Sequence, residues 1–101
     1  MFRTEITDTP EGVLIVADGR LDTVSAVDFE KALSVLKGKN SLNLIIDCSG
    51  LSYISSTGLR IFLSLQKEVN VANGRLKILN MSEIIKEIFD MTGLSQLFIF
   101  E

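Results

Sequence analysis

The sequence has no histidine and only one cysteine among its 101 residues. Ser-His-Asp and Cys-His catalysis both need an imidazole that takes the proton of the nucleophile, so neither can operate in this chain. Zinc sites in proteins rely on histidine or on several cysteines, and these ligands are missing as well. We therefore expect no catalytic residues, no metal site and no cofactor.

Motifs that hold the phosphates of nucleotides are also missing, because the chain contains neither Gly-x-x-x-x-Gly-Lys nor Gly-x-Gly-x-x-Gly. Ser64 and Lys67 have the spacing of a Ser-x-x-Lys pair, but they lie within a helical pattern and lack companion motifs. A solvent-exposed helix turn explains them better. A serine-based hydrolase remains only as a minor alternative, since it would lack a base.

Clusters of positive charge and long apolar runs are missing too. The ten lysines and arginines are scattered and the net charge is −3, which argues against nucleic-acid binding. No apolar run approaches the roughly 18 residues of a membrane span, and residues 1–5 lack the apolar core of a signal peptide. We expect a cytoplasmic protein with no membrane partner, in which Cys48 is a buried, unreactive side chain.

Hydrophobic residues make up 47% of the sequence, which suits a packed core, and the length predicts one domain over residues 1–101. The patterns predict strands at residues 2–7, 13–17, 42–47, 76–79 and 97–100. Amphipathic helices carry apolar residues at 26–36, 59–72 and 84–89, and residues 19–23 form a loop. The order ββαβαβαβ predicts an α/β fold with a mixed, mostly parallel sheet and helices packed on it.

Local signals also predict where the helices begin and end. Ser25 is expected to cap the first helix and Gly38 to end it. In the third helix, the inward positions are expected to be Ile84, Ile85, Ile88 and Phe89.

Three adjacent hydroxyl side chains, Ser55, Ser56 and Thr57, stand where an apolar segment gives way to the second helix. A hydroxyl at a helix start can cap free backbone N–H groups, and a phosphate there would meet the same donors and the positive end of the helix dipole. The run is therefore a cap, a phosphoacceptor or both. Its loop and the loop at residues 19–23 each follow a strand and precede a helix, so we expect Asp22 and Ser56 on neighbouring parts of the surface.

Residues around this run have two interpretations each. Gly58 is either an ordinary helix-start residue or, as we favour, a gap that lets the backbone of a partner approach the hydroxyls. Asp22 is either a loop cap or a partner contact. The remaining large side chains nearby are expected to anchor the core or the loop: Leu21, Leu51, Tyr53 and Ile54.

Three segments together resemble the STAS family, and in particular its stand-alone bacterial anti-sigma factor antagonists. They are Gly19-Arg20-Leu21-Asp22, Ile45-Ile46-Asp47-Cys48-Ser49 and Tyr53-Ile54-Ser55-Ser56-Thr57-Gly58-Leu59. The resemblance covers essentially the whole chain and implies a STAS-like domain that acts as a switch rather than an enzyme. In such antagonists a serine is phosphorylated by a partner that is both anti-sigma factor and serine kinase. The unphosphorylated antagonist binds that partner and frees the sigma factor, and a serine phosphatase restores it.

Carried onto this chain, the resemblance implies that Ser56 is the acceptor. The helices show no obvious extra apolar stripe, so we expect a monomer that forms hetero-complexes. The implied docking surface consists of Asp22, Ser55, Ser56, Thr57, Gly58, Leu59 and Arg60. Members similar to the sporulation antagonists have Asp where this chain has Ser55, so Ser55 and Thr57 stay open as alternative acceptors. A STAS scaffold that binds a partner or a nucleotide without phosphorylation is the alternative function.

Overall fold

The structure, a computed structural model, describes residues 1–36 and 43–101. Its short apolar stretches form strands, and its longer amphipathic stretches form helices. In chain order the elements are β1 (Phe2–Thr9), β2 (Gly12–Leu21), α1 (Thr23–Leu33), η1 (Ser34–Leu36), β3 (Asn43–Asp47), β4 (Leu51–Ile54), α2 (Ser56–Val71), β5 (Arg75–Leu79), α3 (Glu83–Met91), η2 (Leu94–Leu97) and β6 (Ile99–Phe100).

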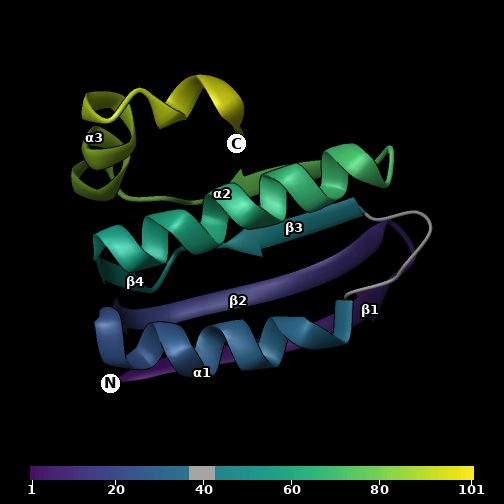
Figure 1. The fold of residues 1–101 in the computed structure, drawn as a ribbon, viewed down its shortest axis with the longest axis horizontal. Helices are drawn as coiled ribbons and strands as arrows, with labels where there is room; N and C mark the ends of the chain where they lie inside the picture. The colour runs from purple at the N-terminus through teal and green to yellow at the C-terminus, as the bar shows by residue number, and fades with distance from the viewer. Residues whose placement is uncertain (37–42) are drawn as a thin grey trace.

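The strands form one mixed sheet in the order β1-β2-β3-β5-β6. β1 is antiparallel to β2, whereas β2, β3, β5 and β6 are joined by parallel pairings. β4 pairs in parallel with the last part of β2, beyond the part that β3 occupies. Figure 1 shows α1 and α2 side by side across one face of the sheet, with α3 beyond α2. The ends of β2 and β4 and the starts of α1 and α2 therefore share one edge.

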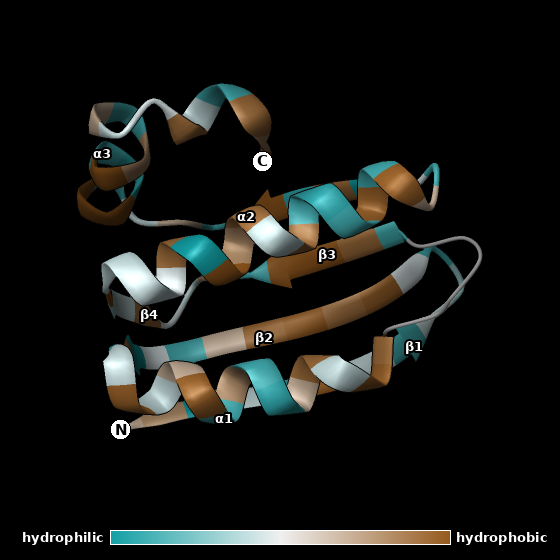
Figure 2. Ribbon diagram, viewed as in Figure 1, coloured by the Kyte–Doolittle hydropathy of each residue, from teal (hydrophilic) through white to brown (hydrophobic). Residues whose placement is uncertain are grey.

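The core lies between the sheet and the helices. Along β2, the buried side chains Val13, Ile15 and Ala17 alternate with partly exposed ones, as expected for a strand with one covered face. Figure 2 shows the apolar middle of β2 and β3 beneath the two helices. The fold class predicted from the sequence, an α/β domain with a mixed, mostly parallel sheet, is confirmed.

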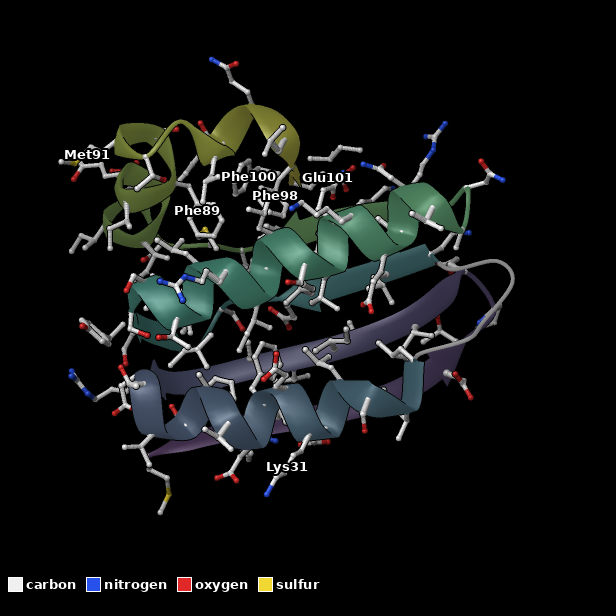
Figure 3. All side chains as sticks on the ribbon, viewed as in Figure 1. Lys31, Phe89, Met91, Phe98, Phe100 and Glu101 are labelled. Atoms are coloured by element: carbon white, nitrogen blue, oxygen red, sulfur yellow. The ribbon has the colours of Figure 1, made fainter. Side chains whose placement is uncertain are left out.

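A chain of phenylalanines joins the three helices. The ring of Phe62 on α2 lies 6.4 Å from that of Phe29 on α1 and 5.7 Å from that of Phe89 on α3, measured between centroids. Phe89 in turn contacts Phe98 and Phe100, at 5.5 and 5.8 Å. Figure 3 shows these three side chains between α3 and the C-terminal segment. The aromatic contacts thus attach α3 and the end of the chain to the rest of the core.

The predicted order lacked one strand, and one predicted strand was too short, for the same reason. β4 lies in the segment after Asp47 that was interpreted as a loop, and β2 continues to Leu21 through the predicted loop at residues 19–23. The two stretches pair with each other, at Gly19, Arg20 and Leu21 on β2. Hydrogen bonds between segments far apart in the sequence leave no local pattern, so β4 and the last part of β2 were not predicted.

The start of α1 and the inner face of α3 also differ from expectation. Asp22, rather than Ser25, is the N-cap of α1, because β2 runs to Leu21 and the helix begins almost directly after it. On α3, Ile84 is 74% exposed, whereas Ile85 and Phe89 are buried.

The ends of two further elements complete the comparison. The last strand begins only at Ile99, since Leu94–Leu97 forms a 3₁₀ helix. Gly38 and Leu42, which were expected to end a helix and begin a strand, lie outside the described residues. Within the described part of the chain, no helix has the length and apolar character needed to cross a membrane.

Candidate functional site

The pairing of β4 with β2 brings two helix starts together. Leu21 is in register with Ile54, and the backbone N–H of Ser55 donates to the Leu21 carbonyl at 2.9 Å. Asp22 and Ser55 follow these strand ends and are the N-caps of α1 and α2. The expected proximity of the Asp22 segment and the hydroxyl run is therefore confirmed.

Asp22 is held by a reciprocal capping box with Ser25. The Asp22 carboxylate accepts from the backbone N–H of Ser25 at 2.9 Å, and the Asp22 N–H donates to the Ser25 hydroxyl at 2.9 Å. The Ser25 N–H and hydroxyl hold the pKa of the Asp22 carboxyl below its ordinary value of 3.8. Asp22 thus has a structural role as the N-cap of α1. Its contact with a partner stays a prediction.

Replacing Asp22 with asparagine should change how stability depends on pH. Asparagine caps a helix about as well as aspartate, but it does not ionise. Because the pKa of Asp22 is lowered on folding, the charged carboxylate stabilises the fold above pH 3.8. This contribution is lost as the pH falls through the lower folded-state pKa.

The urea midpoint of the wild type should therefore exceed that of Asp22→Asn near neutral pH, and the difference should shrink below pH 3.8. Asp47, whose carboxyl pKa is also lowered, is present in both proteins and cancels in the comparison. A difference that stays constant down to acid pH would contradict this role of Asp22.

The three hydroxyls of the run occupy different positions. The Ser55 hydroxyl accepts from the backbone N–H of Gly58 at 3.2 Å and so caps α2. Ser56, the first residue of α2, is exposed, and Thr57 is partly exposed. Among the residues that the structure describes, no hydrogen bond involves the hydroxyl of Ser56 or Thr57. The cap and a free, accessible hydroxyl therefore belong to two neighbouring serines.

Gly58 has an intramolecular reason to be glycine. A Cβ atom at this position would lie 2.8 Å from Cγ1 of Ile54 and 2.9 Å from Cγ of Leu21, closer than side chains pack. The interpretation that the missing side chain leaves room for a partner is therefore wrong, since Leu21 and Ile54 fill that space. Because Gly58 has no side chain, the start of α2 can pack closely on the ends of β2 and β4.

The next two residues of α2 differ in accessibility. Leu59 belongs to the core and is only 9% exposed, so it offers little surface to a partner. Arg60 is exposed, one helical turn after Ser56. Of the predicted docking surface, Ser56 and Arg60 are the most accessible members.

Asp47 and Cys48 end β3 and begin the turn that leads to β4. Burial, with the charge of Asp47 as a smaller cause, raises the pKa of the Cys48 thiol to about 12, so it stays protonated near neutral pH. Asp47 accepts from the Ser49 N–H at 3.0 Å, which lowers the pKa of its carboxyl. In residues 1–36 and 43–101, no group of three or more His, Cys, Asp or Glu side chains could hold a metal ion.

One pair of side chains at this edge was not predicted. Leu51, Tyr53 and Ile54 were expected to anchor the core or the loop; Leu51 and Ile54 are buried, whereas Tyr53 is 38% exposed. The Arg20 guanidinium lies over the Tyr53 ring, with its Cζ 4.3 Å from the ring centroid. The two residues are paired across β2 and β4, so only knowledge of β4 could have revealed them.

Comparisons with known proteins point to one family. The model of the STAS domain matches residues 3–101. The anti-sigma-B factor antagonist of Staphylococcus epidermidis is 33% identical over 79 residues, which are 78% of this chain and 73% of that protein. The protein of the same name from Staphylococcus aureus is 30% identical over 79 residues, with the same coverage of 78% and 73%.

Solved structures share the fold at lower sequence identity. An anti-sigma factor antagonist from Mycobacterium paratuberculosis has a TM-score of 0.86 at 21% identity, covering 99% of this chain and 85% of the other. The unphosphorylated form of the anti-sigma factor antagonist SpoIIAA has a TM-score of 0.76 at 22% identity, with coverage of 100% and 87%. The phosphorylated form of the Bacillus protein SpoIIAA has a TM-score of 0.75 at 24% identity, with coverage of 100% and 91%.

Proposed function

Because this chain belongs to the STAS domain family, we propose that it is an anti-sigma factor antagonist that works as a phosphorylation-controlled switch. Its unphosphorylated form binds an anti-sigma factor that is also a serine kinase, and this binding frees the sigma factor. Phosphorylation of Ser56 blocks the binding, and a serine phosphatase reverses it. Relatives named anti-sigma-B factor antagonists support this role.

The observation that carries the proposal is that the hydroxyls of Ser55 and Ser56 have different environments. Ser55 caps α2 through its bond to the Gly58 N–H, so its hydroxyl is engaged. Ser56 is exposed, and its hydroxyl makes no hydrogen bond within the described residues. A kinase therefore meets an exposed acceptor oxygen at a capped helix start, which favours Ser56 over Ser55.

The position of Ser56 explains how a phosphate would act without unfolding the domain. A phosphate adds about −1.5 to −2 charge near neutral pH. At the first position of α2 it meets the positive end of the helix dipole, an interaction of about 0.3 to 1 kcal/mol at the surface. The same charge and bulk would have to be desolvated in a close interface, which is costly without a cationic partner. The switch thus acts on binding and leaves the fold intact.

The remaining accessible residues of the docking surface supply its chemistry. Asp22 lies beside Ser55 and presents a carboxylate at the start of α1. Arg60 presents a cation on the same helix. We propose that the partner contacts Asp22 at the start of α1 and Arg60 one turn into α2, in addition to the acceptor.

Phosphorylation of the purified protein tests the proposal. The protein is incubated with ATP and, one at a time, with the anti-sigma factor kinases from the same genome. The partner kinase should place one phosphate on Ser56, which mass spectrometry of peptides locates. The phosphorylated form should lose binding to that kinase in a titration. Its free energy of unfolding should differ from that of the unmodified form by no more than about 1 kcal/mol.

Other results would lead to different conclusions. Binding to a kinase without any transfer of phosphate would favour the scaffold function in place of the switch. A loss of several kcal/mol of stability on phosphorylation would show that the modification acts on the fold. Hydrolysis of a model ester that Ser56→Ala abolishes would show an enzyme.

A further inference from the structure

The Arg20–Tyr53 stack, defined as the side chains of these two residues, lies beside the acceptor segment on the surface. Arg20 is exposed and Tyr53 is 38% exposed. Each residue is directly followed by a buried residue, Leu21 or Ile54, and then by the N-cap of a helix. The stack is therefore continuous with the edge that carries Asp22, Ser55 and Ser56.

The guanidinium of Arg20 has unused hydrogen-bonding capacity. In the described residues, its side chain makes no ion pair and donates no hydrogen bond. Asp18 pairs with Arg3 at 3.0 Å, and the Asp22 carboxylate accepts from the Ser25 N–H, with the charge of Arg20 only the smallest cause of the lowered pKa of Asp22. An arginine presents up to five N–H donors in a planar fork that matches a carboxylate.

The aromatic ring fixes the direction of this fork. A guanidinium that stacks on an aromatic face keeps its in-plane N–H groups free for a second ligand. Stacking also reduces the side-chain freedom that a partner would otherwise have to restrict on binding. Tyr and Arg are among the residues that contribute most to binding at protein interfaces.

We propose that the Arg20–Tyr53 stack extends the docking surface of the antagonist and receives a carboxylate of the anti-sigma factor kinase. The proposal rests on the function given above. It adds a contact between Arg20 and a carboxylate of the kinase to a docking surface that otherwise centres on Ser56. The charge of Arg20 attracts the carboxylate, and the ring of Tyr53 packs against the apolar surface around it.

A titration tests this proposal. It measures the Kd between the antagonist and the ADP-bound form of the kinase that phosphorylates Ser56. Arg20→Glu should raise the Kd about tenfold or more, because it replaces attraction by repulsion. Tyr53→Ala should raise it several-fold, about as expected for loss of an interface aromatic. Tyr53→Phe should leave it unchanged, since it keeps the ring.

Arg75→Glu is the matched control, because it makes the same charge change at an exposed residue. Arg75 begins β5, at the end of the sheet opposite the strand ends that lead to Asp22 and Ser55. Its Kd should stay within about twofold of the wild type, since exposed charges farther apart than about 10 Å are largely screened at 0.1 M salt. The wild-type affinity should also fall with rising salt more steeply than that of Arg20→Glu.

The outcomes separate the two proposals. If the wild type binds the kinase and both Arg20→Glu and Tyr53→Ala bind equally well, the stack is not part of the interface, while the switch stands. If the wild type neither binds nor is phosphorylated by any anti-sigma factor kinase of the genome, the switch fails and the assignment of the stack fails with it. Unchanged thermal unfolding of the variants shows that a weaker affinity reports on binding.

Discussion

Ser56→Ala is expected to reduce phosphate incorporation by the partner kinase to background and to leave the protein permanently able to bind. The free hydroxyl of Ser56 is lost, while the cap of α2 stays, because the bond from the Gly58 N–H goes to Ser55. The variant should therefore be about as stable as the wild type, since surface substitutions usually change stability by about 0.5 kcal/mol or less. Peptide mass spectrometry measures the first effect, and a titration with the unmodified kinase measures the second.

Ser55→Ala is the matched control for the neighbouring hydroxyl. It removes the N-cap, which is expected to cost about 1 kcal/mol of stability. Because the Ser56 hydroxyl remains, phosphorylation should continue at that residue. The opposite pattern, in which Ser55→Ala abolishes phosphorylation and Ser56→Ala does not, would make Ser55 the acceptor. Phosphate located on Thr57 in both variants would transfer the assignment to that residue.

Phe62→Ala is expected to cause the largest loss of stability of any substitution considered. Phe62 is completely buried and contacts the rings of Phe29, Phe89 and Phe98, so it joins the three helices and the C-terminal segment. Truncation of a buried Phe to Ala typically costs about 3 to 5 kcal/mol, against a total stability of about 5 to 15 kcal/mol for a domain. Chemical denaturation of the wild type and the variant measures the difference.

Ile84→Ala is the control for Phe62→Ala, because it truncates a large apolar side chain that is exposed instead of buried. Ile84 is 74% exposed on α3, and its truncation should change the free energy of unfolding by about 0.5 kcal/mol or less. The sequence pattern had placed Ile84 on the inner face of this helix, so a loss of 2 kcal/mol or more, as for a buried Ile, would restore that expectation. A small loss at Phe62 would show that the aromatic contacts do not hold α3 to the core.

The predicted site depended partly on local chemistry and partly on pairing between distant segments. Local chemistry identified the hydroxyl run as a helix start, because Ser and Thr accept from free N–H groups at such positions. Which serine caps the helix depends on where β4 ends, and that end is set by its pairing with β2. The role of Gly58 was misjudged for the same reason, since the side chains that fill its space come from Leu21 and Ile54.

The Arg20–Tyr53 stack illustrates a limit of sequence patterns. Tyr53 stands between Ser52 and Ile54 in a short segment, and as a large side chain it was expected to anchor the core or the loop. In the structure its side chain faces away from the core and lies beside Arg20, a residue from another strand. No periodicity within either segment carries this information, because it resides in the register between the strands.

The sequence by itself determined the absence of histidine-dependent chemistry, the alternation of strands and helices, and the position of the hydroxyl run at a helix start. Each of these depends on composition or on residues within a few positions of one another. The tertiary structure alone decided that β4 exists, that Asp22 lies beside Ser55, and that Ser55 rather than Ser56 caps α2. These features depend on hydrogen bonds and packing between segments separated by a whole helix, for which the local sequence contains no signal.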